Sequence, residues 1–178
     1  MSWRVFRKQR IRALETAIRG RKIDKNLEGL LKAISKNENL ATLTSCSGRI
    51  LLTKWRKEKH SSNYYRIWHK ADREEVELAI SGYALKQMLW FVVEPFSLSV
   101  AAKDADSAFA FAKKMEKMGI NCSISKKKER YDIEAKGPHS MRMPVNPILG
   151  HWDDIVDIAN DVMETNLELL KKSEKVKW

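Results

Sequence analysis

The order of helical and extended patterns along the chain restricts its fold more than any other feature. Apolar residues repeat at helical spacing across residues 2–20, which end in a glycine, and again from Asp24 to Ile34. Extended stretches then occupy residues 39–44 and 49–55. Because two helices precede the first strands and further helices interrupt the later ones, the sequence predicts an α/β (α+β) fold, with a mixed β-sheet flanked by helices on both faces.

The same alternation continues to the end of the chain. No tandem repeat or linker interrupts it, so residues 1–178 are expected to form a single domain. Pro95 cannot donate a ladder hydrogen bond and should lie at an edge or a bend. No glycine-rich strand-to-helix turn is present, which argues against a Rossmann methyltransferase fold. The further elements expected are a strand at residues 64–68, a helix at 72–84, an extended stretch at 88–102, a helix at 104–119, a basic hairpin at 120–136 and a helix at about 153–171.

Positive charge is abundant and unevenly distributed. The chain has 34 Lys or Arg against 23 Asp or Glu, a formal net charge of +11. Residues 1–22, 54–60 and 113–130 are strongly basic, whereas residues 151–178 carry seven acids and four lysines. This pattern favours a polyanionic partner, nucleic acid first, bound by one face or end of the molecule.

The sequence also restricts compartment and metal chemistry. Cys46 and Cys122 are far apart and lack the paired spacing of a zinc site or a redox dithiol, so reduced thiols and no metal are expected. The longest apolar run, from Met88 to Val93, is too short to cross a bilayer, and the first twenty residues have no apolar centre typical of a signal peptide. A cytoplasmic protein without membrane contact is predicted.

The stretch "TLTSCSGRI", residues 42–50, places hydroxyls, a thiol, a glycine and an arginine between two strands. One interpretation is a hairpin turn, in which Gly48 adopts a left-handed conformation. The other is a loop whose N–H groups, hydroxyls and Arg49 converge on an anionic or polar ligand. Local chemistry leaves both interpretations open.

Several short motifs, in this order, resemble one known family. "TLTSCSGRI", "RIWHK", "VVEPFSLSV", "MRMPV" and "DIANDVMETNLELLKK" are similar to the signatures of the tRNA wybutosine-synthesising protein 3 methyltransferases in their short archaeal form. The resemblance extends from Trp3 to about Lys172, and the "SCSGR" block is its most specific part. Relatives usually have a basic residue in the Glu-Pro strand and a histidine near its end, where this chain has Val92 and Ser99.

The resemblance implies methyl transfer from S-adenosylmethionine (AdoMet), without a metal, to a ring nitrogen of the wyosine-type tricyclic base beside the anticodon of tRNA(Phe). Alignment of nucleophile, methyl and sulfur would supply most of the acceleration. The alternative is a noncatalytic RNA-binding protein that retains the fold and the charge. Either protein would use the basic first helix and the "KKKER" hairpin to contact phosphates, although lysine-rich hairpins are also common as solvated loops.

The resemblance also implies roles for individual residues. Catalytic roles fall to Ser45, Ser47, Arg49 and His69. Cofactor contacts fall to Ser47, Gly48, Glu94 and Pro95. Contacts with the tRNA are expected from Arg49, Trp68, His69, Lys126, Lys127 and Lys128.

Structural interpretations compete with several of these roles. Trp68 is compatible with a core position or a base-stacking platform, and His69 with a satisfied surface histidine or a base contact. Glu94 either serves the cofactor or forms an ion pair, with Arg49 as the expected partner. Asp24 is expected to be a helix N-cap, and Asn160 to tie the last helix to a loop.

Overall fold

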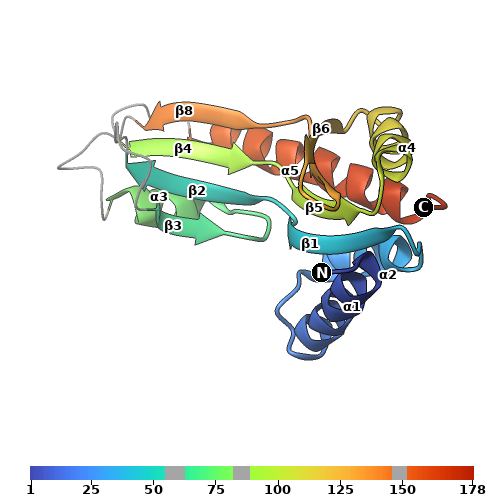
Figure 1. The fold of residues 1–178 in the computed structure, drawn as a ribbon. Helices are drawn as coiled ribbons and strands as arrows, with labels where there is room; N and C mark the ends of the chain where they lie inside the picture. Colours follow the sequence, from blue (N-terminus) through green and yellow to red (C-terminus); the bar gives the residue numbers. More distant parts are fainter. Residues whose placement is uncertain (55–62, 82–88, 146–151) are drawn as a thin grey trace. The chain divides into compact units, whose positions relative to one another are not determined.

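The structure is a computed structural model that describes residues 1–54, 63–81, 89–145 and 152–178 (Figure 1). The chain divides into two compact units, each made of separate stretches. Unit 1 consists of Met1–Ser47, Phe96–Pro138 and Leu167–Trp178, and unit 2 of Gly48–Pro95 and His139–Asn166. The chain therefore passes between the units four times. That all 178 residues act as a single domain stays a prediction.

Unit 1 contains a four-stranded sheet in the order β1-β5-β7-β6, in which every neighbouring pair is antiparallel. The strands are β1 (Leu40–Cys46), β5 (Ser97–Ala102), β6 (Asn121–Lys126) and β7 (Tyr131–Lys136). The helices are α1 (Trp3–Arg19), α2 (Lys25–Ser35), α4 (Ala105–Glu116) and the end of α5 (Trp152–Glu174).

The core of unit 1 lies on one face of this sheet. Along β5, Leu98 and Val100 are buried, whereas Ser97 and Ser99, which alternate with them, are half-exposed on the other face. Leu98 and Val100 belong to one apolar cluster with buried residues of α2 and α4, such as Leu30. The cluster therefore forms because every second residue of a strand faces the helices, and each helix turns one apolar side toward the strands.

Arginines of α1 cover the free edge of β1. Arg7 Nε donates to the carbonyl of Leu40 at 3.3 Å, and Arg10 Nε donates to the carbonyl of Thr42 at 3.0 Å. Arg7 Nη2 also donates to the carbonyl of Ser35 at 2.8 Å. An exposed strand edge invites pairing with other chains, and these guanidinium groups occupy its carbonyls. Arg7 and Arg10, two of the basic residues in the segment 1–22, thus stabilise the fold.

Unit 2 contains a second antiparallel sheet in the order β3-β2-β4-β8. Its core joins alternate residues of β2 and β4, such as Leu52 and Phe91, to apolar residues of α3 and α5, such as Val76 and Val156. Its elements are β2 (Arg49–Lys54), β3 (Asn63–Ile67), α3 (Arg73–Ser81), β4 (Leu89–Glu94), β8 (Met141–Val145) and the first part of α5.

The predicted α+β, non-Rossmann class is confirmed, but the single mixed sheet is wrong, because the described residues form two sheets in which all pairings are antiparallel. The expected extended stretch at residues 88–102 divides at Pro95 into β4 and β5, which belong to different units. Pro95 lies at this break, as predicted. The ends of the elements expected at residues 49–55 and 72–84, and the beginning of that at 88–102, lie outside the described residues.

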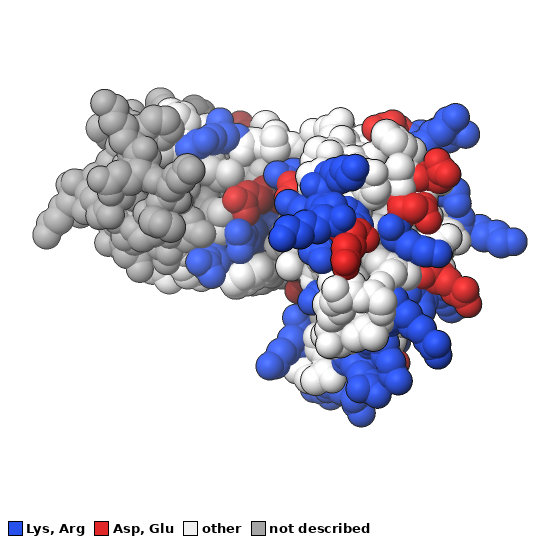
Figure 2. All heavy atoms as spheres, in the orientation of Figure 1, with Lys and Arg blue, Asp and Glu red and all other residues white. Residues whose placement is uncertain are grey.

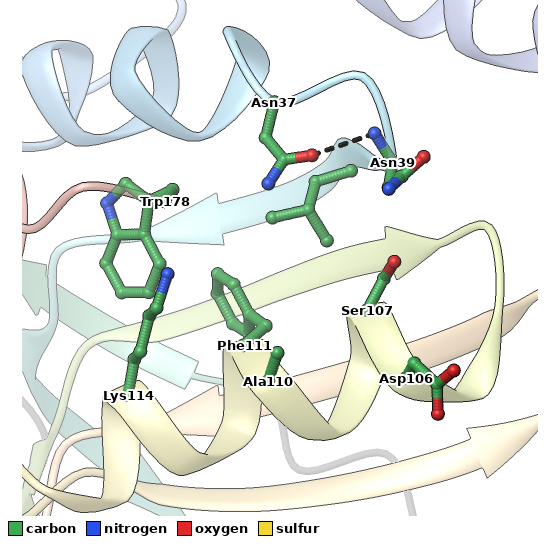
Figure 3. A pocket seen from close by; sticks show the side chains of 9 residues that line it. Asn37, Asn39, Asp106, Ser107, Ala110, Phe111, Lys114 and Trp178 are labelled. Carbon is green, nitrogen blue, oxygen red and sulfur yellow. Dashed lines mark hydrogen bonds between the residues drawn. The ribbon is translucent and has the colours of Figure 1, made fainter.

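The C-terminal residues pack on α4 in unit 1. The ring centroids of Trp178 and Phe111 are 4.8 Å apart, and Lys114 Nζ donates to the carbonyl of Lys177 at 2.7 Å. Figure 3 shows Trp178, Phe111 and Lys114 around a cavity of about 310 Å³. In the ranges that the structure describes, no helix has the length and apolarity that a membrane span needs. The cytoplasmic location stays a prediction.

Candidate functional site: the SCSGR turn and a basic surface

Ser47, the third residue of the "SCSGR" turn, lies in unit 1 and is held by Asp24. Ser47 N donates to Asp24 Oδ2 at 3.1 Å, and Ser47 Oγ donates to the same oxygen at 2.7 Å. Ser47 is buried. Asp24 occupies the N-cap position of α2, but its side chain makes no capping hydrogen bond there. The expected N-cap role is therefore wrong for the carboxylate, which orders Ser47 instead.

The turn is not a hairpin. β1 before it and β2 after it belong to different sheets, so the hairpin interpretation is wrong. Gly48 has φ +98°, a left-handed value that other residues adopt only with strain. The backbone conformation therefore requires the glycine of the motif.

Arg49, the first residue of β2, pairs with Glu94, the last residue of β4. The two residues are opposite each other in the strand register, and Arg49 Nε lies 2.8 Å from Glu94 Oε2. The predicted ion pair is thus confirmed. Their side chains are 27% and 42% exposed. Among the described residues the recorded contact of Arg49 uses Nε alone, so both Nη groups can bind an anion.

Trp68 lies at the same end of the unit 2 sheet as Arg49. It follows Ile67, which pairs with Ile50 in the neighbouring strand. Its side chain is 49% exposed, so the core interpretation is wrong. An exposed indole ring suits a base-stacking platform.

His69 belongs to an exposed hydrogen-bonded group centred on Glu75. His69 Nε2 lies 3.1 Å from Glu75 Oε2, and Tyr65 Oη donates to Glu75 Oε1 at 3.2 Å. This hydrogen bond, with smaller effects of burial and negative charge, raises the pKa of Tyr65 above its ordinary value. The histidine is therefore satisfied, as one interpretation predicted, and its orientation leaves Nδ1 for another partner.

Ser45 lines a cavity of about 340 Å³ in unit 1. Leu14 of α1 and Leu31 of α2 contribute apolar walls, and Arg10 and Thr44 contribute polar groups. The N-terminal part of the turn thus faces an open cavity with both hydroxyl and apolar surface. This environment suits a ligand that has a ring system and a sugar.

The first helix and the basic hairpin adjoin in unit 1. The Arg130 guanidinium lies 4.5 Å from the Phe6 ring centroid, and the N-terminal ammonium pairs with Glu129 at 3.1 Å. Lys127 and Lys128 line an open cavity of about 250 Å³ beside this contact. Lys126, at the end of β6, is exposed next to them. Two segments that the sequence predicted to contact phosphates therefore form one surface.

A larger groove of about 700 Å³ runs along α1. Figure 2 shows Lys and Arg side chains over α1 on the face drawn. Within the described part of the chain, no ion pair is recorded for the four exposed basic residues that line the groove. They are Arg4, Lys8, Arg12 and Lys103. Residues 55–60 of the basic segment 54–60 lie outside the described residues.

Asn160 has the structural role that was expected. Its Oδ1 accepts from Ala71 N and its Nδ2 donates to the Ala71 carbonyl, both at 2.9 Å, so it ties α5 to the loop before α3. Sequence reasoning missed the role of Asp24 as acceptor for Ser47, which lies 23 residues away. An aspartate directly before a helix gives the same local signal whether or not it caps that helix.

The chain is similar to known proteins over almost its whole length. The family model described as Methyltransferase TYW3 matches residues 6–175. This chain belongs to the TYW3 methyltransferase family. A relative from Pyrococcus horikoshii, named tRNA(Phe) 7-((3-amino-3-carboxypropyl)-4-demethylwyosine(37)-N(4))-methyltransferase 1, is 31% identical over 94% of this chain and 91% of its own. An Archaeoglobus fulgidus relative with the same activity in its name is 27% identical over 99% and 90%.

Solved structures share the fold of this chain over most of its length. The PH1069 protein from Pyrococcus horikoshii matches with a TM-score of 0.86 and 26% identity over 97% of this chain and 94% of its own. A hypothetical protein from Aeropyrum pernix has the same fold, with a TM-score of 0.76 at 21% identity. The predicted family and its methyltransferase class are thus confirmed. The family implies a methyl donor, whereas the roles of the site residues and the absence of a metal stay predictions.

Proposed function

We propose that this protein transfers a methyl group from AdoMet to the N(4) ring nitrogen of a wyosine-type base in tRNA(Phe), in wybutosine or wyosine biosynthesis. Family membership and the names of the relatives support this reaction. The observation that carries the proposal is the pair of hydrogen bonds from Ser47 to Asp24, because they hold the "SCSGR" turn in one conformation before any ligand binds.

AdoMet suits the side chains around this turn. The cavity beside Ser45 has apolar walls for an adenine ring, and hydroxyls for a ribose. When bound, AdoMet supplies an electrophilic methyl group on a sulfonium sulfur. Cofactor contacts of Ser47, which belongs to unit 1, and of Gly48, Glu94 and Pro95, which belong to unit 2, stay predictions from the family resemblance.

The protein's own residues would orient the acceptor base and hold the released proton. Trp68 offers an exposed ring on which the base stacks, and the Nη groups of Arg49 bind a phosphate or carboxylate. Methylation forms a nitrogen–carbon bond, breaks the carbon–sulfur bond and releases the ring N–H proton. His69 Nδ1 can accept that proton while Nε2 donates to Glu75. In unit 1, Ser45 lines the cavity described above, and the Ser47 hydroxyl, which donates to Asp24, keeps lone pairs that can accept a hydrogen bond.

The tRNA would bind the basic surface of unit 1. The groove along α1 and the hairpin lysines 126–128 present exposed cations without recorded ion pairs among the described residues. Such groups contact phosphates irrespective of base sequence.

Mass spectrometry of hypomodified tRNA(Phe), incubated with the protein and AdoMet, tests the proposal. One additional methyl group on the tricyclic nucleoside is expected. The competing function is a noncatalytic RNA-binding protein, which the basic groove alone would equally support. Calorimetric titration with AdoMet separates the two, since tRNA binding without AdoMet binding or methyl transfer would exclude the methyltransferase.

A further inference from the structure

The open face of the unit 1 sheet carries a small polar cavity to which the proposed function above assigns no role. Opposite residues in an antiparallel sheet share a face, and Ser99 is opposite both Thr44 and Glu134, while Ser97 is opposite Lys136. Together they line a cavity of about 220 Å³ with the backbone of β5 and β7 beneath it. Three hydroxyls, one carboxylate and one ammonium therefore meet across three neighbouring strands.

Glu134 and Lys136 present opposite charges on the same side of β7. They are two residues apart, so their backbone attachment points are separated by roughly 7 Å. Both side chains are exposed, and within the described ranges no ion pair is recorded for either. The carboxylate can accept from an ammonium and the ammonium can donate to a carboxylate, with the hydroxyls of Thr44, Ser97 and Ser99 supplying further hydrogen bonds.

We infer that this cavity binds the ammonium and carboxylate of an α-amino-acid group, with Glu134 on the ammonium and Lys136 on the carboxylate. An α-amino-acid group carries both charges on one carbon, so it fits between two side chains of opposite sign. A simple anion or cation would meet one favourable and one unfavourable charge, and would bind less well.

The identity of the molecule that carries this α-amino-acid group rests on the proposed function. Two sources have the same chemistry. One is the methionine part of AdoMet, and the other is the 3-amino-3-carboxypropyl group in the name of the Pyrococcus horikoshii relative's substrate. The cavity therefore contributes either to donor binding or to selection of the base that carries the side chain.

Two binding measurements on the full chain distinguish the sources. S-adenosylhomocysteine is titrated by calorimetry, and hypomodified tRNA(Phe) with or without the aminocarboxypropyl group is compared by filter binding. Each is measured for the wild type, Lys136→Ala and Glu134→Gln. Glu116→Gln at the end of α4 and Lys117→Ala directly after it are matched controls. Circular dichroism checks that all variants fold, which is expected because both side chains are exposed.

If the cavity binds the donor, both variants should weaken S-adenosylhomocysteine binding about 10-fold or more and leave the ratio between the two tRNAs unchanged. If it binds the base, the variants should reduce the preference for the tRNA that carries the group by a similar factor. The inference is overturned if neither quantity changes more than in the controls. A wild type that binds these ligands but transfers no methyl group would refute the proposed function alone.

Discussion

Ser47 and Arg49, two residues apart in one motif, are held in opposite ways. Ser47, in unit 1, is buried, and one carboxylate oxygen accepts from both its N–H and its hydroxyl. Arg49, in unit 2, makes one recorded contact through Nε to a carboxylate that is 42% exposed. Buried hydrogen bonds are costly to leave unmade, whereas partly exposed ion pairs contribute little stability.

This difference indicates that the two ends of the motif have different roles. The serine end is preorganised, since Ser47 cannot change partners without leaving polar atoms unsatisfied. The arginine end can exchange Glu94 for a ligand at small cost. We therefore expect changes on the Ser47 side to affect stability and activity together, and changes at Arg49 to affect activity almost alone.

The largest effect is expected from Arg49→Ala. Methyl transfer measured by mass spectrometry should fall by about 100-fold or more, because the donors for a developing or bound anion are lost. The free energy of unfolding should change by at most about 1 kcal/mol, as the ion pair is partly exposed. Arg49→Lys keeps the charge but not the planar fork, so it should restore little activity. Normal turnover by Arg49→Ala would contradict the assignment.

Asp24→Ala should combine a stability loss with a smaller loss of activity. Two donors of Ser47 lose their acceptor, at a cost of about 1–3 kcal/mol in urea unfolding. Methyl transfer should fall by about 10-fold, because the turn is no longer held. Asp24→Asn retains an acceptor oxygen and should recover part of both quantities. A stable variant with normal activity would show that Ser47 needs no support.

Replacing Lys126, Lys127 and Lys128 together by alanine should weaken tRNA binding several-fold, chiefly at low salt. Each lost phosphate contact should reduce the slope of log affinity against log salt by about 0.9. The double variant Lys113→Ala, Lys117→Ala, in α4 and directly after it, is a control for the loss of positive charge outside the hairpin. An unchanged slope would show that the tRNA phosphates do not contact the hairpin lysines.

The smallest effect concerns Asp104, a residue of unit 1 that does cap a helix, unlike Asp24. Its Oδ1 accepts from Ser107 N at 2.9 Å. Hydrogen bonding with the Ser107 side chain, and to a smaller extent with the Ser107 backbone N–H, lowers the pKa of Asp104 below its ordinary value. A lowered folded-state pKa contributes stability above the unfolded value, near 3.8, and this stability is lost as the pH falls through the folded value.

Asp104→Ala should therefore cost about 1 kcal/mol at pH 7 and progressively less below pH of about 4. Urea unfolding across this pH range measures the change, and methyl transfer at pH 7 should stay normal. A cost that does not depend on pH would show that the carboxylate charge does not contribute to the cap.

Local sequence patterns predicted most helices and strands, but they did not predict which strands pair with one another. The periodicity of α1 and α4, the hairpin of β6 and β7, and the break at Pro95 all arise from residues close in sequence. The separation into two sheets does not, because alternation along a strand indicates a buried face without identifying its neighbour. β8 was not predicted, since its five residues include a proline.

In the candidate site, too, the sequence predicted some contacts and missed others. The Arg49–Glu94 pair was predicted because an isolated carboxylate in an apolar strand needs a cation. The bond between Asp24 and Ser47 was not, because it joins residues that only tertiary structure brings together. The roles of Trp68 and His69 were left open by sequence, and exposure decided against the core for Trp68.

The four passages of the chain between the units have a consequence for biosynthesis. Unit 2 lacks part of α5 until Asn166 has been translated, and unit 1 stays incomplete until Leu167–Trp178 leave the ribosome. Neither unit is complete before α5 has been translated as far as Asn166, so a nascent chain arrested before this helix should remain sensitive to proteases throughout.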